Sequence, residues 1–563
     1  MQNPLSLTGK RWIIPERKDA VPSAIPARLM AERSLSSGNA LLDPWIFPDM
    51  PRAVERVRRA IAAGETIGIF GDYDCDGITA TALLVRLLKR HGNEPVVRLP
   101  HRVHDGYGLN RTIIEECGVR GVTLLLTVDT GITAIKEIAL ASARGIDVIV
   151  TDHHHVQDEV PKALALIHPA LAPRHPLPHP SGAGVALQFI RAFEGADEWD
   201  DRQTDLALAA IGTIADLVEL RGVNRVLVQQ GIAALNALDK GPLSLLAASV
   251  RTQGGPLTST DVAFRLSPRI NAAGRMQDPL IALTALLEGG EALTRLGQLN
   301  THRQDATGGL FARAWQLLHL SSQPRPEEMA ALPALLTVTG TDVEFPSGLI
   351  GLIAGRLTEA TGHPSVVVTI RDRECTASLR STPAYHVTEG LERVADLLSA
   401  FGGHAQAAGC TFPEQNLAEV LRRLSQDAAA RTTREHLIPA LAADAMIEAR
   451  DISLSFCAQL KQLEPFGQGN PEPVFLLKNV TLEQPRRVGK EGAHLQGRTA
   501  GLKTIGWRLG PLSDHTGQSL DLLCKIGVDT WNGHRAPQIV IEDLRVASSS
   551  LKEETQLPEG VLH

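Results

Sequence analysis

Residues 66–77 read TIGIFGDYDCDG, an apolar run followed directly by three carboxylates at alternate positions. A helical pattern follows at 79–90. The alternation then repeats, with apolar runs at 122–128 and 147–150 separated by a helical stretch at 134–144. Short apolar strands that alternate with helices are typical of a parallel, doubly wound sheet. Because ligands of such sheets bind at the carboxyl ends of the strands, we expect a functional site where these strands end.

Polar side chains follow each of these strands: Asp72, Asp74 and Asp76 the first, Asp129 the second, and the TDHHH of residues 151–155 the third. Taken alone, the first group fits a solvated acidic turn, and an Asp before a glycine often caps a helix. Three successive strand ends with Asp or His favour a metal site, because close carboxylates repel one another unless a cation neutralises them. Mixed carboxylate and imidazole ligands suit Mn²⁺, and two such ions can clamp an in-line displacement at phosphorus.

The order of these motifs resembles that of a known family. DYDxDG, VDTGI and TDHH, followed by GTIAD at 212–216, resemble the four motifs of the DHH phosphoesterases. FGGHAQAAG at 401–409 resembles the signature of the DHH-associated domain, and RINAAGR at 269–275 and LEPFGQGNPEP at 463–473 resemble segments of the RecJ branch. The resemblance covers residues 50–546. It implies an α/β fold with a parallel-sheet DHH domain, a second α/β DHH-associated domain and a C-terminal OB-like β-barrel.

The domain organisation that we predict has seven segments. They are an N-terminal extension (1–48), a DHH catalytic domain (49–225), a helical connector (226–330), a DHH-associated substrate-binding domain (331–430), a linker (431–473), an OB-fold nucleic-acid-binding domain (474–547) and a polar tail (548–563). Within the DHH-associated domain, the pattern predicts strands at 335–338 and 365–370 and helices at 349–360 and 387–399.

The resemblance also implies the ligands of two divalent cations, Mn²⁺ or alternatively Mg²⁺. The metal ligands would be Asp72, Asp74, Asp76, Asp129, His153 and Asp216. The catalytic set would be Asp74, Asp76, Asp129, His153, His154 and Asp216. Asp129 would bridge the two ions, His154 would lie beside the scissile phosphate, and Asp152 would orient the two histidines.

Substrate contacts need cations and amide donors. Arg102 lies in a loop that resembles a family segment, and we expect it to anchor a 5′-phosphate. The other predicted contacts are His154, Arg269, Asn271, Arg275, Ser347, Arg356, Ser378, Arg380, Gly402, Gly403 and His404. For the polar residues of 269–275 the alternative is helix capping and surface salt bridges. The chain departs from the family at Phe345-Pro346, where RecJ relatives carry Trp-His, so a role of that histidine is in doubt.

The predicted barrel is the most basic part of the chain. Residues 476–546 hold ten Lys or Arg and seven Asp or Glu, whereas the whole chain has a net charge of -7. Basic and aromatic side chains on an OB-fold track phosphates and stack bases, so we predict DNA contacts at Lys478, Arg487, Trp507 and Trp531. The alternative is that both tryptophans belong to the barrel core.

The chain as a whole has 563 residues, of which 43% are hydrophobic and 21% charged. It has no apolar run of about 18 residues and no signal-peptide pattern, so we expect a cytoplasmic protein without a membrane partner. Its six cysteines are scattered and form no CxxC pair, which argues against a zinc ribbon or a disulfide framework.

The function that the resemblance implies is a single-stranded-DNA-specific 5′→3′ exonuclease. It would release 5′-mononucleotides by two-metal-ion hydrolysis and act as a monomer in DNA repair and recombination. A single-strand-binding protein and a RecQ-type helicase are implied partners. One alternative is a DHH phosphodiesterase of short oligonucleotides or small nucleotides, and another is a non-catalytic single-strand-binding module. The long chain and the barrel argue against the first, and the complete ligand set argues against the second.

Overall fold

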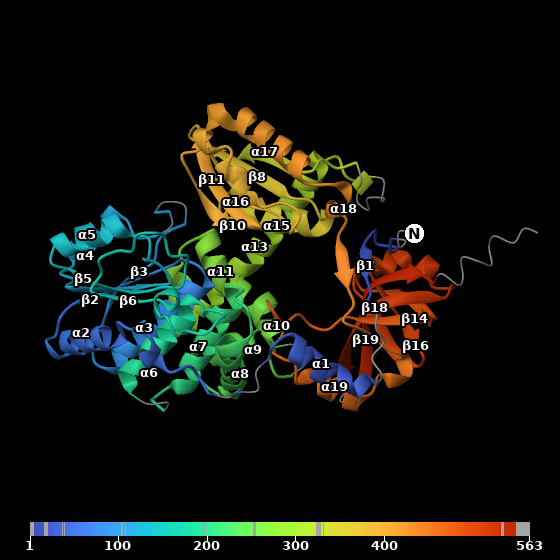
Figure 1. The fold of residues 1–563 in the computed structure, drawn as a ribbon, viewed down its shortest axis with the longest axis horizontal. Coiled ribbons are helices and arrows are strands. Elements are labelled where there is room, and N and C mark those ends of the chain that lie inside the picture. Colours follow the sequence, from blue (N-terminus) through green and yellow to red (C-terminus); the bar gives the residue numbers. More distant parts are fainter. Residues whose placement is uncertain are drawn as a thin grey trace, which may run out of the picture. The chain divides into compact units, whose positions relative to one another are not determined.

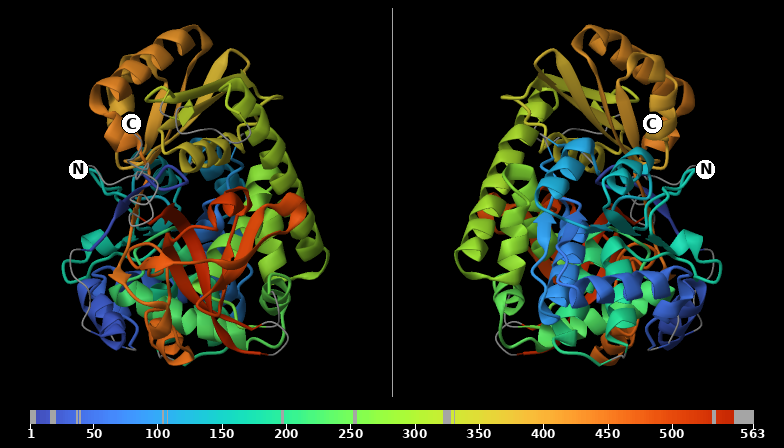
Figure 2. Two further views of the ribbon diagram at one scale, coloured as in Figure 1. Left: turned by 90° about the vertical axis from the view of Figure 1, so that its right-hand side faces the viewer. Right: turned by 90° about the vertical axis from the view of Figure 1, so that its left-hand side faces the viewer.

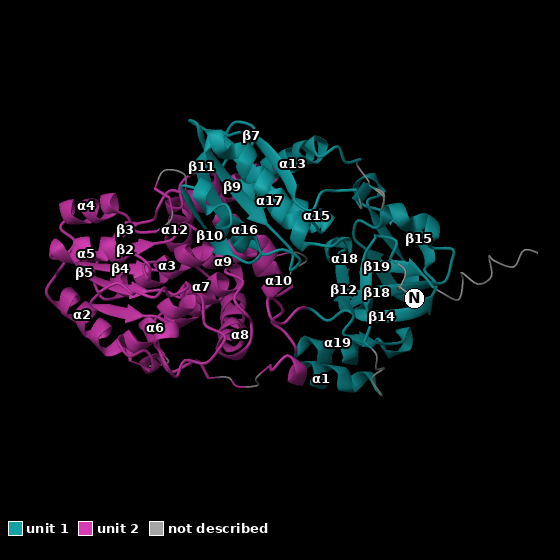
Figure 3. Cartoon of the chain, turned by 45° about the horizontal axis from the view of Figure 1, so that its top comes forward, with its two compact units in different colours: residues 1–29, 306–462, 472–563 teal, residues 30–305, 463–471 magenta. Residues whose placement is uncertain are grey.

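The computed structural model describes residues 5–15, 21–35, 38, 40–102, 105, 106, 108–195, 198–251, 255–321, 328, 329, 331–530 and 534–547. The chain forms two compact units (Figure 3). Unit 1 comprises residues 1–29, 306–462 and 472–563, and unit 2 comprises residues 30–305 and 463–471. Among the described helices, none is both long and apolar enough to cross a membrane.

Unit 2 contains the predicted parallel sheet, which confirms the α/β class of this region. Its strand order is β3-β2-β4-β5-β6, and every pairing is parallel. The strands are β2 (Ile67–Gly71), β3 (Val96–Arg98), β4 (Leu124–Val128), β5 (Asp147–Thr151) and β6 (Ala165–Ile167). β2 and β4 are buried along their whole length, as expected for a sheet that is covered on both faces.

Alternate residues of these strands enter two different cores. Ile67, Leu124 and Ile149 pack in one core with α2 (Met50–Ala62), α3 (Cys75–Arg90) and α6 (Gly182–Glu194). Phe70 and Leu125 pack on the other face with α4 (Arg111–Val119) and α5 (Ile135–Ala143) (Figure 1). Successive side chains point to opposite faces of the sheet, and both faces are buried. The strands therefore read as continuous apolar runs.

The rest of unit 2 is mostly helical. Its helices are α7 (Arg202–Ala215), α8 (Gly222–Ala237), α9 (Pro242–Ala248), α10 (Ser259–Asp261), a π-helix (Val262–Leu266), α11 (Ser267–Met276), α12 (Leu280–Leu287) and the first part of α13 (Gly290–Leu317). Residues 463–471, which we predicted to lie in a linker, pack into this unit. Arg225 Nη1 donates to Leu463 O at 2.8 Å, and Leu220 N donates to Gln468 O at 2.8 Å.

Unit 1 contains the second α/β sheet, with strand order β10-β11-β9-β8-β7. The strands are β7 (Leu336–Thr341), β8 (Ser365–Arg371), β9 (Glu374–Arg380), β10 (Ala400–His404) and β11 (Ala407–Pro413), and only β7 and β8 pair in parallel. The helices are α15 (Ile350–Thr361), α16 (Val387–Glu392) and α17 (Leu417–Arg431). The prediction of one helix over 387–399 was wrong. α16 ends at Glu392 because the chain must return to the sheet edge, where Ser399 N already donates to Thr411 O.

Unit 1 also contains the C-terminal sheet domain. Its seven strands follow the order β13-β14-β18-β19-β17-β16-β15. They are β13 (Ala445–Met446), β14 (Phe475–Val480), β15 (Glu483–Val488), β16 (His494–Thr499), β17 (Leu502–Gly506), β18 (Leu520–Asp529) and β19 (Ala536–Val546). Figure 2 shows these strands, in orange to red, crossing one another as in a strongly twisted sheet. Trp531 and the tail 548–563 lie outside the described residues.

The N-terminal residues pair with this part of unit 1. β1 (Arg11–Ile13) lies parallel to β12 (Ala440–Ala442), and Trp12 Nε1 donates to Asp543 Oδ2 at 2.7 Å. The predicted extension 1–48 is therefore divided, because residues 1–29 belong to unit 1 and residues 30–48 belong to unit 2.

Candidate functional site

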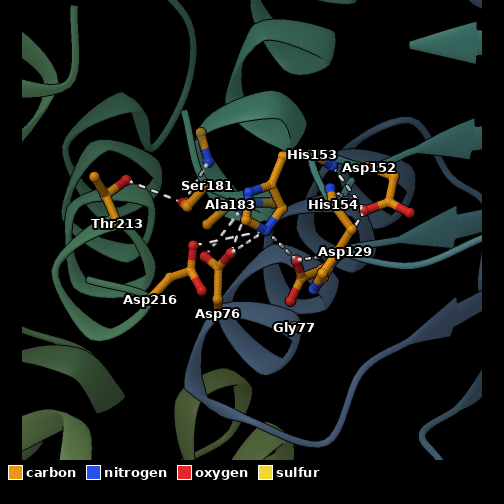
Figure 4. A network of polar contacts seen from close by, with 12 residues as sticks. Asp76, Gly77, Asp129, Asp152, His153, His154, Ser181, Ala183, Thr213 and Asp216 are labelled. Carbon is orange, nitrogen blue, oxygen red and sulfur yellow. Dashed lines mark hydrogen bonds and ion pairs between the residues drawn. The ribbon is translucent and has the colours of Figure 1, made fainter. Parts of the chain in front are cut away.

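The carboxyl ends of three adjacent parallel strands each carry an acidic or histidine side chain, and Figure 4 shows several of these side chains together. Asp72 follows β2, Asp129 follows β4, and the Asp152-His153-His154 segment follows β5. A fourth element contributes Asp216, which caps the C-terminus of α7. The structure thus brings together the residues that we predicted as metal ligands.

The two other carboxylates of the first motif belong to the start of α3. Asp74 Oδ1 accepts hydrogen bonds from Asp76 N and Gly77 N at 3.0 Å, so this helix begins at Cys75, four residues before the predicted start. Asp76 is only 1% exposed. Its carboxylate accepts from Gly182 N at 2.6 Å and Ala183 N at 3.1 Å, at the N-terminus of α6. The partial positive charge of a helix N-terminus suits a buried carboxylate.

The ligand atoms converge, and the dashed lines from His153 in Figure 4 mark contacts at ion-pair distance. His153 Nε2 lies 3.0 Å from Asp129 Oδ1, 3.6 Å from Asp216 Oδ2 and 3.9 Å from Asp76 Oδ2. Among the described residues, neither His153 Nε2 nor Asp129 Oδ1 has a hydrogen-bond partner, although both atoms are buried. Buried polar atoms are nearly always paired, so two that face each other unbonded fit a common cation.

Within the described part of the chain, three groups of side chains have ligand atoms within 4.8 Å of one another: Asp76 with His153 and Asp216, Asp72 with Asp74 and Asp129, and Asp129 with His153 and His154. Because Asp129 and His153 each belong to two of these groups, the centre has room for more than one cation. That Asp129 bridges two ions stays a prediction, because His153 is shared between two groups in the same way.

The protonation states of the centre follow from burial. Burial, followed by repulsion from neighbouring carboxylates, raises the pKa of Asp72 to about 8, of Asp76 to about 7 and of Asp216 to about 9. The same causes raise the pKa of Asp129 well above its ordinary value. Burial lowers the pKa of His153 to about 3, so its imidazole is neutral and keeps a lone pair for a metal. A divalent cation would remove the repulsion among these carboxylates.

Asp152 and His154 form a separate pair beside these ligands. Asp152 Oδ1 accepts from His154 Nδ1 at 2.8 Å and from His153 N at 2.7 Å, while Oδ2 accepts from Ile132 N at 2.9 Å. Burial opposes charge on both groups, but their hydrogen bond and mutual attraction outweigh it. They lower the pKa of Asp152 to about 2 and raise that of His154 to about 9. His154 is therefore a cation held by a carboxylate, as suits a neighbour of a phosphate group.

The N-terminus of α6 was not among the predicted site residues. A Cβ at Gly182 would overlap the carboxylate of Asp129, and one at Gly212 would overlap that of Asp76, so both positions need glycine for the close approach. The sequence signal was Ser181 before Gly-Ala-Gly and an apolar run, which is typical of a helix start. Ser181 Oγ does accept from Gly184 N at 3.3 Å.

Three of the predicted substrate contacts of unit 2 lie near the 72–76 turn. The guanidinium of Arg102 lies 4.2 Å from the ring centroid of Tyr73, and Asn271 Oδ1 accepts from Cys75 N at 2.9 Å. The charge of Arg275 also acts on Tyr73, as one of the smaller influences on its pKa. Arg269 does not join them, because it lies on the other side of α11 and donates to Ser249 Oγ at 2.9 Å.

Four of the five predicted contacts on the second sheet of unit 1 share one face. Ser378 and Gly402 both pair with Gly409, and Arg380 and His404 both pair with Ala407. Cross-strand partners point to the same face, so these residues form the polar sheet face, which we define as Ser378, Arg380, Gly402 and His404. Arg380 Nη1 donates to Ser378 Oγ at 3.0 Å. Gly403 pairs with Ala408 and therefore belongs to the opposite face.

Two further residues predicted for this domain make other contacts, Ser347 through its backbone and Arg356 through its side chain. Ser347 N donates to Asp342 Oδ1 at 2.9 Å. Arg356 lies over the ring of Phe311 at 4.5 Å and donates to Thr307 O at 3.4 Å. Phe345, which replaces the Trp of the family pattern, is 1% exposed in the core beneath α15, so that side chain does not face solvent.

The C-terminal domain exposes Trp507, which is 57% accessible, so the alternative of a core position is wrong for this residue. Its ring lies 4.9 Å from that of His494. Lys478 is also exposed, while Arg487 Nε donates to Ser513 Oγ at 2.8 Å. The same domain has a groove of about 620 Å³ on strands β15 to β17. This groove was not predicted from the sequence. Its lining residues include Arg486, Arg498 and Lys503.

Comparisons with known proteins cover each of these regions. Residues 66–213 match the N-terminal domain of the DHH family, residues 335–430 match the DHHA1 domain, and residues 443–543 match the RecJ OB domain. The single-stranded-DNA-specific exonuclease RecJ of Thermus thermophilus is 35% identical over 88% of this chain and 70% of its own length. The protein of the same name from Salmonella typhimurium is 32% identical over 93% of this chain and 96% of its own length.

Solved structures give the same relationship. The structure of Thermus thermophilus RecJ in complex with Mn²⁺ matches 98% of this chain and 80% of that chain, with a TM-score of 0.78 and 30% identity. Its complex with Mg²⁺ matches with a TM-score of 0.71. The chain spans 65% of the length of another relative, the Bacillus subtilis RecJ, to which it is 31% identical over 90% of its own length.

Proposed function

We infer the activity of this chain from its family, because the chain belongs to the RecJ family of single-stranded-DNA-specific exonucleases, which carry a DHH domain. It is accordingly a metal-dependent nuclease that acts on single-stranded DNA. Our proposal adds the details of that activity. The enzyme degrades the strand from the 5′ end and releases 5′-mononucleotides. It acts in DNA repair and recombination in the cytoplasm.

The observation that carries the catalytic part of the proposal is the convergence of Asp129 Oδ1 and His153 Nε2, which lie 3.0 Å apart, buried and unbonded among the described residues. Asp76, His153 and Asp216 would hold one divalent cation, and Asp72, Asp74 and Asp129 would hold a second. We propose Mn²⁺, with Mg²⁺ as the alternative, because an imidazole ligand suits the former better. When bound, the ions polarise a phosphoryl oxygen and lower the pKa of water.

The residues beside these ligands position the phosphodiester. His154 is a cation that donates to a phosphate oxygen, and Asp152 fixes its ring and its charge. Arg102, which lies against Tyr73 next to Asp72, is the group that anchors the 5′-phosphate of the strand. An anchor for a terminal phosphate next to the metal ligands would give the enzyme its 5′ polarity.

The surfaces of unit 1 hold the rest of the strand. On the polar sheet face, Ser378 and Arg380 supply a hydroxyl and a guanidinium for phosphates. On the C-terminal domain, the exposed ring of Trp507 stacks on a base and the groove of Arg486, Arg498 and Lys503 follows the backbone. A single-strand-binding protein and a RecQ-type helicase are the protein partners that we propose, and the enzyme itself acts as a monomer.

The decisive experiment is a nuclease assay with Mn²⁺ on one single strand labelled at either end, beside its duplex. We expect mononucleotides from the 5′ end of the single strand only, and none with Asp129→Ala. Turnover of dinucleotides without cleavage of the long strand would instead make the protein a phosphodiesterase of short oligonucleotides. Binding of the strand without any turnover would make it a single-strand-binding module.

A further inference from the structure

Unit 2 carries a second polar groove besides the acidic centre. It has a volume of about 590 Å³ and is lined from three directions: the end of α9, the π-helix with the start of α11, and α13. We call it the Phe264 groove and define it by Arg251, Phe264, Arg265, Arg269, Gln298 and Gln304. Nothing in the proposed catalytic mechanism uses this groove.

The charge of the groove is opposite to that of the chain. Among the described residues that line it, three are arginines and none is an Asp or Glu, whereas the whole chain has a net charge of -7. One of the three, Arg265, pairs with Asp261 outside the groove, with Nη1 3.1 Å from Oδ1. The guanidinium of Arg269 is held in place by Ser249, with Nη1 donating to Oγ at 2.9 Å and Nη2 to the carbonyl oxygen at 3.3 Å. Positive charge fixed in position, with amide side chains between, suits a polyanion.

Phe264 is the apolar part of the groove, and it is 78% exposed. The backbone that carries it is anchored at the preceding turn. Thr258 and Asp261 form a capping box before the π-helix, and Ser259 Oγ donates to Phe466 O at 2.7 Å. π-Helical segments are rare and frequently lie at functional sites. An aromatic ring presented to solvent by an anchored segment is a ready platform for stacking.

The same helix connects this groove with the acidic centre. On α11, Asn271 and Gly274 contact the turn of residues 73–75, while Arg269 faces the Phe264 groove. Residues two apart on a helix are separated by about 200°, so the two surfaces lie on opposite sides of one helix, on the order of 10 Å across. A single strand can therefore reach both.

We propose that the Phe264 groove is a second binding site for single-stranded nucleic acid, in which Phe264 stacks on a base and Arg251, Arg265 and Arg269 contact phosphates. The proposal rests on the proposed function, because it adds a contact for the same strand. An exposed aromatic ring among arginines is the chemistry that binds single strands without sequence preference. The groove thus helps to retain long strands.

The test measures the affinity for a long labelled single strand by fluorescence anisotropy, in chelator so that nothing is cleaved. We expect Phe264→Ala to weaken binding about tenfold, and this loss of affinity should become smaller as the strand is shortened. Phe264→Trp should bind as tightly as the unchanged protein. Arg269→Ala should lower the slope of log affinity against log salt by about one. Leu177→Ala is the matched control, because Leu177 is also in unit 2 and is 77% exposed.

Unchanged affinity of Phe264→Ala would overturn the proposal, and so would an equal loss in Leu177→Ala. A loss that is the same for every strand length would also overturn it, since it would indicate a general defect. Because the chelated assay needs no turnover, a protein that fails to cleave DNA would contradict the proposed function and still give a clear result for the groove.

Discussion

Asp76 and Asp129 in unit 2 are at most 2% exposed, whereas every residue of β10 in unit 1 is exposed. The acidic centre is built from buried like charges that only supporting hydrogen bonds and a cation can stabilise. The polar sheet face is built from half-buried side chains of β9 and exposed residues of the edge strand β10. A substitution in the first region should therefore remove an essential group, whereas one in the second should remove a share of the binding energy.

The largest effect should come from Asp129→Asn. Asp129 has a left-handed backbone with φ of 58°, which Asn tolerates, so the change removes the charge while preserving the fold. Because Asp129 belongs to two ligand groups, we expect nuclease activity to fall by roughly a thousandfold or more, beyond the 10–100-fold typical of residues that only support ligands. The control is Asp147→Asn at the start of β5, which should retain activity. Equal losses in the two variants would contradict a special role of Asp129.

Asp152→Asn should have the second largest effect. The amide oxygen can still accept from the backbone, but it cannot hold the charge on His154. We expect a loss of about 10–100-fold together with a higher Mn²⁺ requirement, measured by titrating activity with the metal. A loss as large as that of Asp129→Asn would mean that Asp152 is itself a metal ligand.

Arg380→Ala tests the polar sheet face, where Arg380 is half-buried, and should have a smaller effect. Loss of one charged hydrogen bond to the strand raises KM about tenfold and leaves kcat within about twofold. Arg371→Ala is the matched control, since Arg371 lies at the opposite end of the neighbouring strand β8. If kcat falls with KM unchanged, the polar sheet face acts on the chemical step, and the contrast between the two regions is not valid.

The same contrast explains what could be predicted from the sequence. Strand periodicity and the residues after each strand predicted the parallel sheet and the cluster around Asp129, because the strand ends meet at one sheet edge. The partners of surface side chains were not predictable in this way. Arg269 and Asn271 are two residues apart on one helix, and only the packing of α11 decides which of them faces the 72–76 turn. The support of Asp76 by α6 was missed because it joins residues 106 positions apart.

The smallest effect concerns stability, and it follows from the raised carboxyl pKa values. Without metal, the folded protein retains protons on Asp76, Asp72 and Asp216 up to about pH 7, 8 and 9, whereas the unfolded chain releases them near the ordinary value of 3.8. The resulting stabilisation is complete below pH 3.8 and is lost as the pH rises through 7 to 9. The pKa of His154 is raised to about 9, so its contribution to stability is also lost as the pH rises. The pKa of His153 is lowered to about 3, so its contribution changes only at pH values below 7.

A bound cation takes the place of those protons. Mn²⁺ should therefore stabilise the protein more at a pH at which the carboxyl groups have lost them. We expect the Tm of the chelated protein to fall by a few °C between about pH 7 and about pH 8.5, and Mn²⁺ to abolish most of that fall. Thermal melts with chelator and with Mn²⁺ at both pH values measure this. The polar sheet face has no such buried cluster among its described residues, so Arg380→Ala should leave the pH dependence intact, and Asp129→Asn should reduce it. An identical Mn²⁺ shift at both pH values would show that the metal binds without displacing protons, contrary to the burial of these carboxyl groups.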